Sequence, residues 1–323
     1  DGIGIVNYEY VRDIDTRGVS GIALDESSIL KNGEGETKNW LCSLANGIEY
    51  RLACSATPSP NDQSEYASHA VFLGICKTNK EFYSRFFRKD GNKYVLKAHG
   101  VAPFYQSMSA WACYIQNPSL LGFEYGGYLT DGPEIINEYL SGGEHLTKGT
   151  LFSNSASLSD CFPIYNYRKQ ADTPRFNFVV ETANAYKSIV WCKHNEEEAN
   201  FSKAIENSAL ITGKTKVEKR VDIINAWREG QINCIVSKPE ILGWGVNLQQ
   251  AEAHVYSGYH HSFEEFYQAI RRSHRQGRQG ILKVFLPQIS AEMPIVDLLL
   301  QKQNTFQADV QQLQEHFRTS FYD

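Results

Sequence analysis

The chain has 323 residues, of which 42% are hydrophobic and 21% are charged, and its formal net charge is −5. This length predicts one large domain or two ordinary ones, and the composition suits a soluble globular protein with a sizeable core. No stretch approaches eighteen uninterrupted apolar residues, which argues against a membrane span. The negative net charge argues against a basic coat over the whole surface, but it leaves room for a local basic cleft.

The seven cysteines are widely scattered, and none of them forms a C-x-x-C pair. This pattern argues against a zinc site and against a disulfide framework. It is typical of buried thiols in a reducing compartment, so we expect a cytoplasmic protein.

Three short apolar runs open the chain, at residues 3–6, 22–24 and 52–54, and each is followed by polar residues. Such runs are typical of buried parallel strands. Asp25 and Glu26 come directly after the second run. Paired carboxylates at a strand end can hold Mg²⁺ through its waters and activate an attacking water, although the same pair also occurs in ordinary solvated turns.

Small hydroxyl residues, Ser55 and Thr57, follow the third run directly, about thirty residues after Asp25. Alone, they indicate no more than a Ser/Thr turn before Pro58. Residues 62–140 are rich in aromatic side chains and predict a helical insertion, whose rings either form a core or stack on nucleic-acid bases. Residues 141–174 are rich in Gly, Ser, Asn and Pro, and they predict a linker.

Residues 175–290 alternate between apolar strand patterns and helical spacing, which predicts a parallel α/β sheet covered by helices on both faces. The expected strands are 188–192, 209–212, 234–237, 254–257 and 282–286. Ligands of such sheets bind at the carboxyl ends of the strands. The last segment, 291–323, predicts an amphipathic helical extension.

A basic turn lies inside this second region, where Gly213 and Thr215 flank Lys214. It is not a phosphate loop of the form G-x-x-x-x-G-K-[ST], because Ser208 stands where the first glycine is required. The segment therefore predicts either a plain polar turn or a contact of Lys214 and Lys216 with a nucleic-acid backbone.

Two later segments carry further candidate site residues. The first contains Gly243, Gly245, Asn247 and Gln249, and its glycines would let the backbone approach a ligand or a neighbouring loop. A plain glycine turn remains the alternative. A dinucleotide fingerprint is excluded, because Leu248 stands where the third glycine belongs.

The second segment contains Gln268, Arg272 and Arg275. The three-residue spacing of the two arginines predicts that both lie on one helical face. Paired guanidiniums of this kind stabilise charge on a transferring phosphoryl group. Arg278 and Lys283 extend the positive stretch, so an ordinary basic helix is the alternative.

Together, these segments resemble motifs II, III, IV, V and VI of superfamily 2 helicases, in the correct order, and the resemblance covers nearly the whole chain. The G-x-G-x-N-L-Q pattern is similar to the Swi/Snf-like branch, and residues 259–275 resemble its phage-borne members. The departures are Arg271, where the family often has Gly, and Arg278, where this branch usually has Gln. Because Arg278 departs from the pattern, we expect its loss to be mild.

The resemblance implies tandem RecA-like domains with ATP in the cleft between them. Asp25 would hold Mg²⁺ through water and Glu26 would activate water, while Arg272 and Arg275 would act on the transferring phosphate. Ser55, Thr57, Gly243, Gly245, Asn247, Gln249 and Gln268 would bind ATP or couple its site to the nucleic-acid groove. The nucleic acid would be DNA rather than RNA, with replication or recombination proteins as partners, and a phage-encoded chain would act in the bacterial cytoplasm.

A phosphate loop is absent from the sequence, and only twenty-four residues precede Asp25. The family places that loop well upstream, so we expect residues 1–140 to be an incomplete first domain of an N-terminally truncated chain. This chain alone would then hydrolyse ATP weakly or not at all. The alternative is a nucleic-acid-binding scaffold without turnover.

Overall fold

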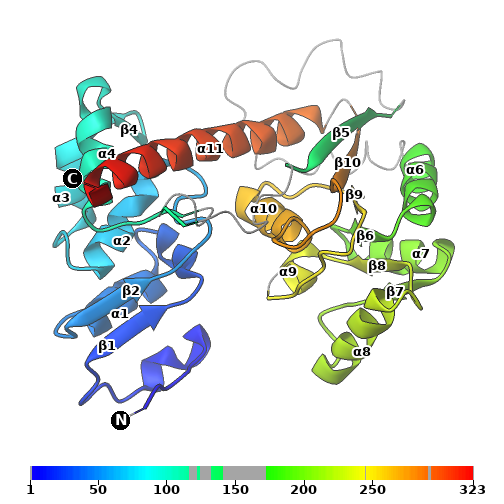
Figure 1. The fold of residues 1–323 in the computed structure, drawn as a ribbon, viewed down its shortest axis with the longest axis horizontal. Helices are drawn as coiled ribbons and strands as arrows, with labels where there is room; N and C mark the ends of the chain where they lie inside the picture. The colour runs from blue at the N-terminus through cyan, green and yellow to red at the C-terminus, as the bar shows by residue number, and fades with distance from the viewer. Residues whose placement is uncertain are drawn as a thin grey trace. The chain divides into compact units, whose positions relative to one another are not determined.

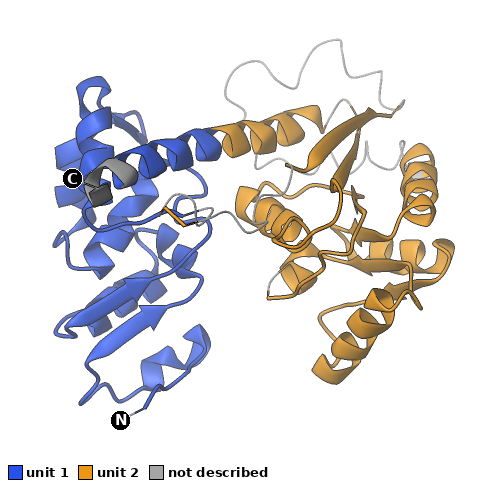
Figure 2. Cartoon of the chain, in the orientation of Figure 1, with its two compact units in different colours: residues 1–115, 305–323 blue, residues 116–304 orange. Residues whose placement is uncertain are grey.

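The computed structural model describes residues 2–115, 122–123, 132–140, 172–243, 245–289 and 292–322, without the side chains of residues 172 and 318–322. The chain divides into two compact units (Figure 2), which are described separately. Unit 1 comprises Asp1–Ile115 and Thr305–Asp323, and unit 2 comprises Gln116–Asn304. Within the described residues, no helix is long and apolar enough to cross a membrane.

Unit 1 begins with a parallel strand pair covered by helices on one face (Figure 1). Its elements are η1 (Tyr8–Asp13), β1 (Gly21–Leu24), η2 (Ser27–Lys31), α1 (Glu36–Ala45), β2 (Tyr50–Ala53), η3 (Gln63–Glu65), α2 (Tyr66–Phe72), α3 (Asn79–Phe86), β3 (Phe87–Asp90), β4 (Lys93–Leu96), η4 (Ala98–Gly100), α4 (Val101–Ser109) and the part of α11 (Met293–Tyr322) from Thr305 onward. The predicted strands at 22–24 and 52–54 correspond to β1 and β2.

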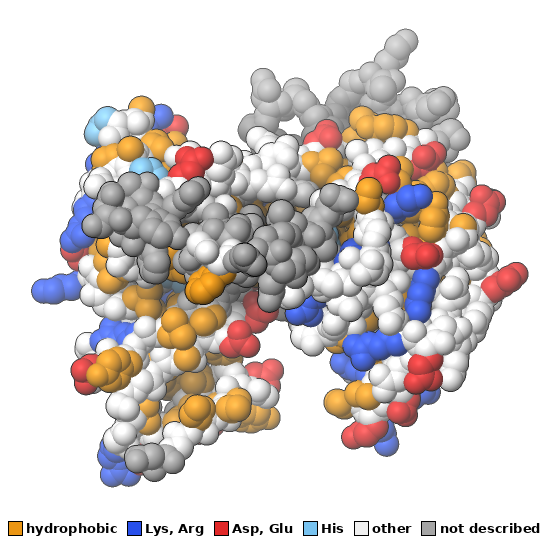
Figure 3. Space-filling view, viewed as in Figure 1, with side chains coloured by type: hydrophobic (Ala, Val, Ile, Leu, Met, Phe, Trp, Pro, Cys, Tyr) orange, Lys and Arg blue, Asp and Glu red, His pale blue; other side chains and the backbone are white. Residues whose placement is uncertain are grey.

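The prediction of fully buried strands is wrong for this part of the chain. Residues 3–6 form no strand, and Ile3 and Ile5 are 95% and 92% exposed. Leu52 on β2 is 56% exposed, while Leu24 on β1 packs against Leu41 of α1. Leu24 is buried while Leu52 is exposed because, among the described residues, β1 pairs only with β2 and helices cover only one face of that pair. Figure 3 shows hydrophobic side chains on the surface near these strands.

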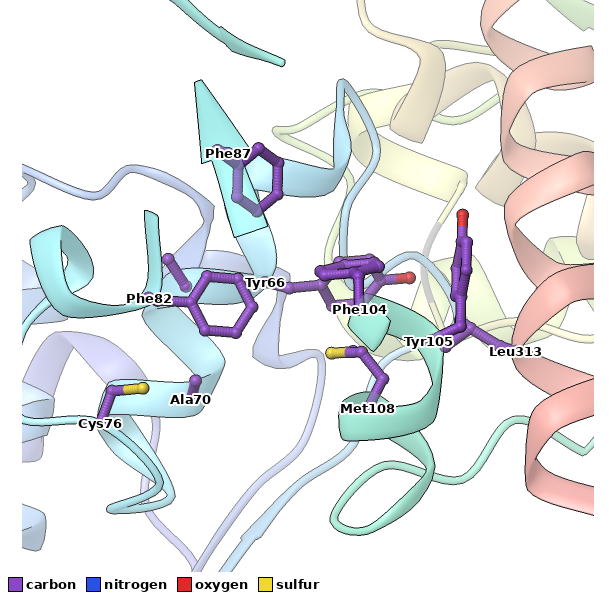
Figure 4. Close-up of a cluster of buried hydrophobic side chains, with 10 residues drawn as sticks. Tyr66, Ala70, Cys76, Phe82, Phe87, Phe104, Tyr105, Met108 and Leu313 are labelled. Atoms are coloured by element: carbon purple, nitrogen blue, oxygen red, sulfur yellow. The ribbon is translucent and has the colours of Figure 1, made fainter. Parts of the chain in front are cut away.

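An aromatic core fills the rest of unit 1, where α2, α3, α4 and the β3–β4 hairpin meet (Figure 4). Phe104 is fully buried, and its ring centroid lies 5.0–6.1 Å from those of five other rings. The close neighbours are Tyr66, Phe82, Phe86, Phe87 and Tyr105. Phe104 and Tyr105 are therefore core residues rather than exposed platforms for bases. The hairpin also adds strands to a segment that was predicted to be helical.

The middle of α11 packs on this aromatic core. Asp309 is buried, and its two carboxylate oxygens accept hydrogen bonds from Tyr66 (2.7 Å) and Tyr105 (2.6 Å). Leu313, one turn further on, joins the same cluster. Burial raises the pKa of Asp309, and the two hydroxyls offset part of that effect.

Unit 2 is a parallel sheet flanked by helices, as predicted. Its elements are β5 (Glu134–Tyr139), α6 (Asp172–Ala185), β6 (Ser188–Trp191), α7 (Asn195–Ala204), β7 (Ser208–Leu210), α8 (Val217–Arg228), β8 (Cys234–Ser237), α9 (Pro239–Leu242), β9 (Ala253–Tyr256), α10 (Phe263–Arg271), β10 (Lys283–Gln288) and the start of α11. In the described residues the strand order is β5-β10-β9-β6-β8-β7, and every neighbouring pair is parallel. The strands β6, β8 and β9 are buried along their whole lengths, which explains their continuous apolar sequence.

The position of β5 differs from the prediction, which assigned residues up to 140 to the first domain. Glu134 pairs with Lys283, so β5 forms the edge of the unit 2 sheet next to β10. Which strand an edge strand joins depends on long-range hydrogen bonds that a local pattern does not encode. The predicted linker at 141–174 lies outside the described residues up to 171, and α6 begins at Asp172.

Candidate functional site

The two carboxylates of unit 1 lie on a tight turn at the carboxyl end of β1. The exposed Asp25 accepts a hydrogen bond from the backbone N–H of Glu26 at 3.0 Å, and Glu26 has a left-handed φ of 50°. Tyr8 donates its hydroxyl to the main-chain oxygen of Asp25 at 2.6 Å. Burial, followed by the charges of Asp25 and Glu26, raises the pKa of Tyr8 to about 12, so its hydroxyl stays a donor.

An exposed carboxylate at this turn fits a water-mediated contact with Mg²⁺. Proteins commonly bind Mg²⁺ through one or two carboxylates, several waters and the phosphates of a substrate. Within the described residues, no cluster of three His, Cys, Asp or Glu side chains forms a complete metal cage. Asp25 provides one exposed carboxylate of the kind that binds such a hydrated ion.

Ser27 and His69 hold the carboxylate turn against the loop after β2 and against α2. The N–H of Ser27 donates to the carbonyl of Cys54 at 2.8 Å, which continues the β1–β2 pairing past the strands. The Ser27 hydroxyl lies 3.2 Å from Nε2 of His69, and both side chains are buried. Burial lowers the pKa of His69 to about 4, so the ring is neutral at pH 7. No sequence pattern indicated His69, because it lies 42 positions away from Ser27.

The hydroxyl residues Ser55 and Thr57 lie on the loop after β2, beside the loop after β1. The N–H of Thr57 donates to the Ser55 hydroxyl at 3.1 Å, and Thr57 is fully buried. Since β1 and β2 are parallel neighbours, their carboxyl ends share one edge. This arrangement brings the carboxylate turn and the hydroxyl loop together, as a coupling role would require.

In unit 2, positions 243 and 245 require glycine for two different reasons. A Cβ atom on Gly243 would lie 2.2 Å from the carbonyl oxygen of Pro239, and Gly245 has a φ of +69°. Asn247 accepts the N–H of Gln249 on its side chain at 3.2 Å, which closes the next turn. Residue 244, between the two glycines, lies outside the described residues. Both positions therefore call for glycine, for steric reasons at Gly243 and conformational reasons at Gly245.

Gln268 and Arg272 are joined at the end of α10. The buried Gln268 accepts a hydrogen bond from the Arg272 guanidinium on its side-chain oxygen at 2.8 Å and another on its main-chain oxygen at 3.3 Å. These contacts fix the direction of a half-buried arginine. The Gln-x-x-x-Arg spacing thus has a direct physical basis, because the two residues are four apart on one helical ridge.

The prediction that Arg272 and Arg275 share a helical face is wrong. The helix α10 ends at Arg271, Arg272 is its C-cap, and the exposed Arg275 lies in the following turn. The N–H of Arg275 bonds to the carbonyl of Ser273 rather than to a residue four positions back. Gly277 then adopts a φ of +81°, which an α-helix does not accommodate.

The turn that carries these arginines is attached to the neighbouring glycine segment. The N–H of Leu248 donates to the carbonyl of Arg272 at 2.8 Å. The next residue, Ser273, is buried and lies 2.8 Å from Nε2 of His254 on β9. The two segments predicted to contribute to one site in the second domain are therefore hydrogen-bonded to each other.

Lys214 and Lys216 are exposed on the turn between β7 and α8. Arg220 braces this turn, because its guanidinium donates to the carbonyls of Thr215 (2.8 Å) and Thr212 (3.2 Å). The turn thus holds two ammonium groups in solvent on a fixed backbone. Acidic side chains are interspersed with basic ones elsewhere on the visible surface of unit 2 (Figure 3).

Comparison with known proteins gives a match in the same unit. Residues 173–277 match the family described as "Helicase conserved C-terminal domain". A curated relative, the ATP-dependent RNA helicase FAL1 of Candida glabrata, is 28% identical over 110 residues, which cover 33% of this chain and 26% of the relative. The chain thus covers about a quarter of the length of that relative. A solved structure, the C-terminal part of the Fun30 ATPase domain, matches with 16% identity and a TM-score of 0.37, over 43% of this chain and 52% of that one.

The matched stretch contains every site residue predicted for unit 2, from Lys214 to Arg275. The parallel sheet flanked by helices in this part of the chain is consistent with a RecA-like helicase C-terminal domain. The carboxylate turn of unit 1 lies outside the matched stretch.

Proposed function

We propose that this protein is an ATP-dependent helicase or translocase that acts on nucleic acid. The observation that carries the proposal is the match of residues 173–277 to the helicase C-terminal domain, because that stretch includes Gln268, Arg272 and Arg275. The hydrogen bond between Leu248 and Arg272 supports the proposal. It joins the two segments of unit 2 that we assign to one nucleotide site.

In this proposal, Asp25 holds hydrated Mg²⁺, which would neutralise charge on the phosphates of ATP. Glu26 orients the attacking water and accepts its proton. Gln268 keeps Arg272 in a fixed direction, and the exposed Arg275 stabilises negative charge on the transferring phosphoryl group. Ser55 and Thr57 are proposed to couple this chemistry to the nucleic acid, because their loop adjoins the carboxylate turn.

For the nucleic acid, we propose contacts between Lys214 and Lys216 and backbone phosphates. Exposed ammonium groups on a braced turn suit this role, because phosphate contacts supply most sequence-independent affinity. We propose DNA rather than RNA as the substrate, a Swi/Snf-like and phage-type origin, and replication or recombination proteins as partners. These finer assignments rest on the sequence resemblance, and the curated relative is named as an RNA helicase.

The test is phosphate release from ATP by the protein encoded in its complete reading frame, with single-stranded DNA, duplex DNA or RNA added. We expect nucleic acid to stimulate turnover, and Glu26→Gln to lower kcat by about 10²-fold or more, as expected for loss of a general base. Nucleic-acid binding without any turnover would contradict the proposal and would favour the scaffold alternative. Stimulation by RNA alone would overturn the preference for DNA.

A further inference from the structure

Arg278 has an unusual environment for a residue outside the proposed catalytic groups. Its side chain is only 8% exposed, although it carries a positive charge. The guanidinium donates to three main-chain oxygens: those of Gln249 (3.0 Å), Ala251 and Gly280 (3.0 Å). Two of these acceptors belong to the segment after the glycines, and the third lies on the chain that follows Arg278 itself.

The planar shape of the guanidinium explains why arginine suits this position. It presents five N–H donors in fixed directions, so one side chain can bond carbonyls on two different segments at once. Burial of the charge lowers the pKa of Arg278, and Glu252 offsets part of that effect. A buried charge costs free energy that an apolar side chain would avoid. Arginine at this position therefore stabilises the structure through its hydrogen bonds to the main-chain oxygens of the two segments, not through its charge.

The contacts of Arg278 hold one end of the turn that carries the two arginines. At the other end, the N–H of Leu248 donates to the carbonyl of Arg272. Arg275 lies between these two attachments, and its carbonyl accepts the N–H of Arg278 at 3.2 Å. The turn 272–278 is thus attached to the segment 247–251 at both ends.

We propose that Arg278 is a positioning residue that holds the turn 272–278 against the segment 247–251 and thereby sets the direction of Arg275. The role of Arg275 in this inference rests on the proposed function. The attachment of the turn by Arg278 rests only on the contacts above. This role contradicts the expectation that loss of Arg278 would be mild, which was based only on the departure of Arg278 from the family pattern.

The variants Arg278→Gln and Arg278→Lys test the inference, with Arg228→Gln as a matched control. Arg228 donates to the carbonyl of Asn247 at 2.9 Å, so it contacts the same segment through an exposed side chain. Gln and Lys each keep an N–H donor but lack the planar set of donors that lets the guanidinium bond both segments at once. Two variants are used so that a folding failure of one leaves the other to decide.

The first readout is amide hydrogen exchange. For both Arg278 variants we expect exchange at Leu248 and residues 273–278 to rise by about tenfold or more, with exchange at Val255 on β9 unchanged, since local opening is independent of global unfolding. The control should leave the amides of 273–278 unchanged. An equal rise throughout unit 2 would overturn the inference, because Arg278 would then stabilise the unit as a whole. Unchanged exchange at Leu248 and 273–278 would overturn it as well.

The second readout is steady-state ATP hydrolysis by the protein encoded in the complete reading frame, with and without the Arg278 change. We expect Arg278→Gln to lower kcat by about 10- to 100-fold with less than about a twofold change in KM, since a misplaced group loses transition-state stabilisation first. If the unaltered protein hydrolyses ATP and Arg278→Gln leaves kcat unchanged, the inference fails and the proposed function stands. If the unaltered protein has no ATPase activity, the proposed function fails, and the exchange data alone support or overturn the holding role.

Discussion

The imidazole of His254 lies 2.8 Å from the hydroxyl of Ser273, and both side chains are fully buried. Ser273 directly follows Arg272, so this contact anchors the arginine-bearing turn to the sheet. Burial, and then the charge of Arg278, lowers the pKa of His254 to about 3. The ring is therefore neutral at pH 7, and a proton on it would destabilise the fold.

The first prediction concerns the pH dependence of stability. His254 has a pKa of about 3 in the folded state, against about 6.5 for an unperturbed histidine, so the unfolded state binds more protons between these values. The stabilisation is complete above pH 6.5 and is lost as the pH falls towards 3. This one group should contribute a slope of about 1.4 kcal/mol per pH unit.

Urea unfolding at pH 5.5 and pH 7.5 provides the measurement. The His254→Gln variant should lose less stability than the unaltered protein when the pH is lowered. His69 acts in the same direction, because its pKa is also lowered, so some pH dependence will persist in the variant. Identical pH dependence of the two proteins would show that folding does not lower the pKa of His254.

The second prediction compares three glycine-to-alanine variants. Gly243→Ala should destabilise by about 1–3 kcal/mol, because its Cβ would lie 2.2 Å from a carbonyl oxygen and the backbone must shift. Gly245→Ala should cost about 1–2 kcal/mol, because its φ is +69°. Gly213→Ala is the control, with no atom near its Cβ, and should stay within about 0.5 kcal/mol. The free energy of unfolding of each variant decides among these outcomes.

The third prediction concerns nucleic-acid binding by the 323-residue chain. If the protein contacts four phosphates, the slope of log affinity against log salt should be about −3 to −4. Replacing both Lys214 and Lys216 by Ala should make that slope less negative by about 2, since each phosphate contact contributes about 0.9. Lys203→Ala, at an exposed lysine near the end of α7, should leave it unchanged. A salt-independent affinity would indicate a protein-binding surface instead.

Much of the unit 2 sheet could be predicted from the sequence. The strands β6 and β8 read as continuous apolar runs because parallel strands are buried on both faces. The same reasoning failed at residues 3–6, because an apolar run becomes a buried strand only where neighbours pair with it and cover it. The sheet position of β5 was also missed, since its pairing with β10 joins residues about 150 positions apart.

The candidate site was predictable in its motif residues but not in the contacts that hold them. Spacing indicated Gln268 and Arg272, whose direct hydrogen bond depends only on helical geometry. It did not indicate that α10 ends before Arg275, because Ser273 turns inward to His254, which is 19 residues away. The sequence placed Arg278 in a basic stretch but did not show that it is buried, because charge patterns do not reveal which guanidinium is buried.

The last prediction concerns Arg275 and separates a motor from a scaffold. The proposed function places this exposed guanidinium on the transferring phosphoryl group, where charge accumulates in the transition state. Arg275→Ala should therefore lower kcat by at least about 10²-fold, because arginine fingers contribute on the order of 10³–10⁵. Nucleic-acid affinity without nucleotide should change by less than about 1 kcal/mol, because an arginine finger acts on ATP rather than on the nucleic-acid backbone.

Arg271→Ala is the matched control for this change. Arg271 is also exposed and lies near Arg275 in the sequence, but its guanidinium contacts His274 (3.2 Å) and the ring of Tyr267. We expect this variant to keep kcat within about threefold, as is usual for a surface substitution. The measurement is phosphate release by the protein of the complete reading frame at saturating ATP and nucleic acid. If Arg275→Ala weakens nucleic-acid binding and leaves turnover intact, Arg275 contacts the phosphate backbone, and its assignment to ATP hydrolysis is wrong.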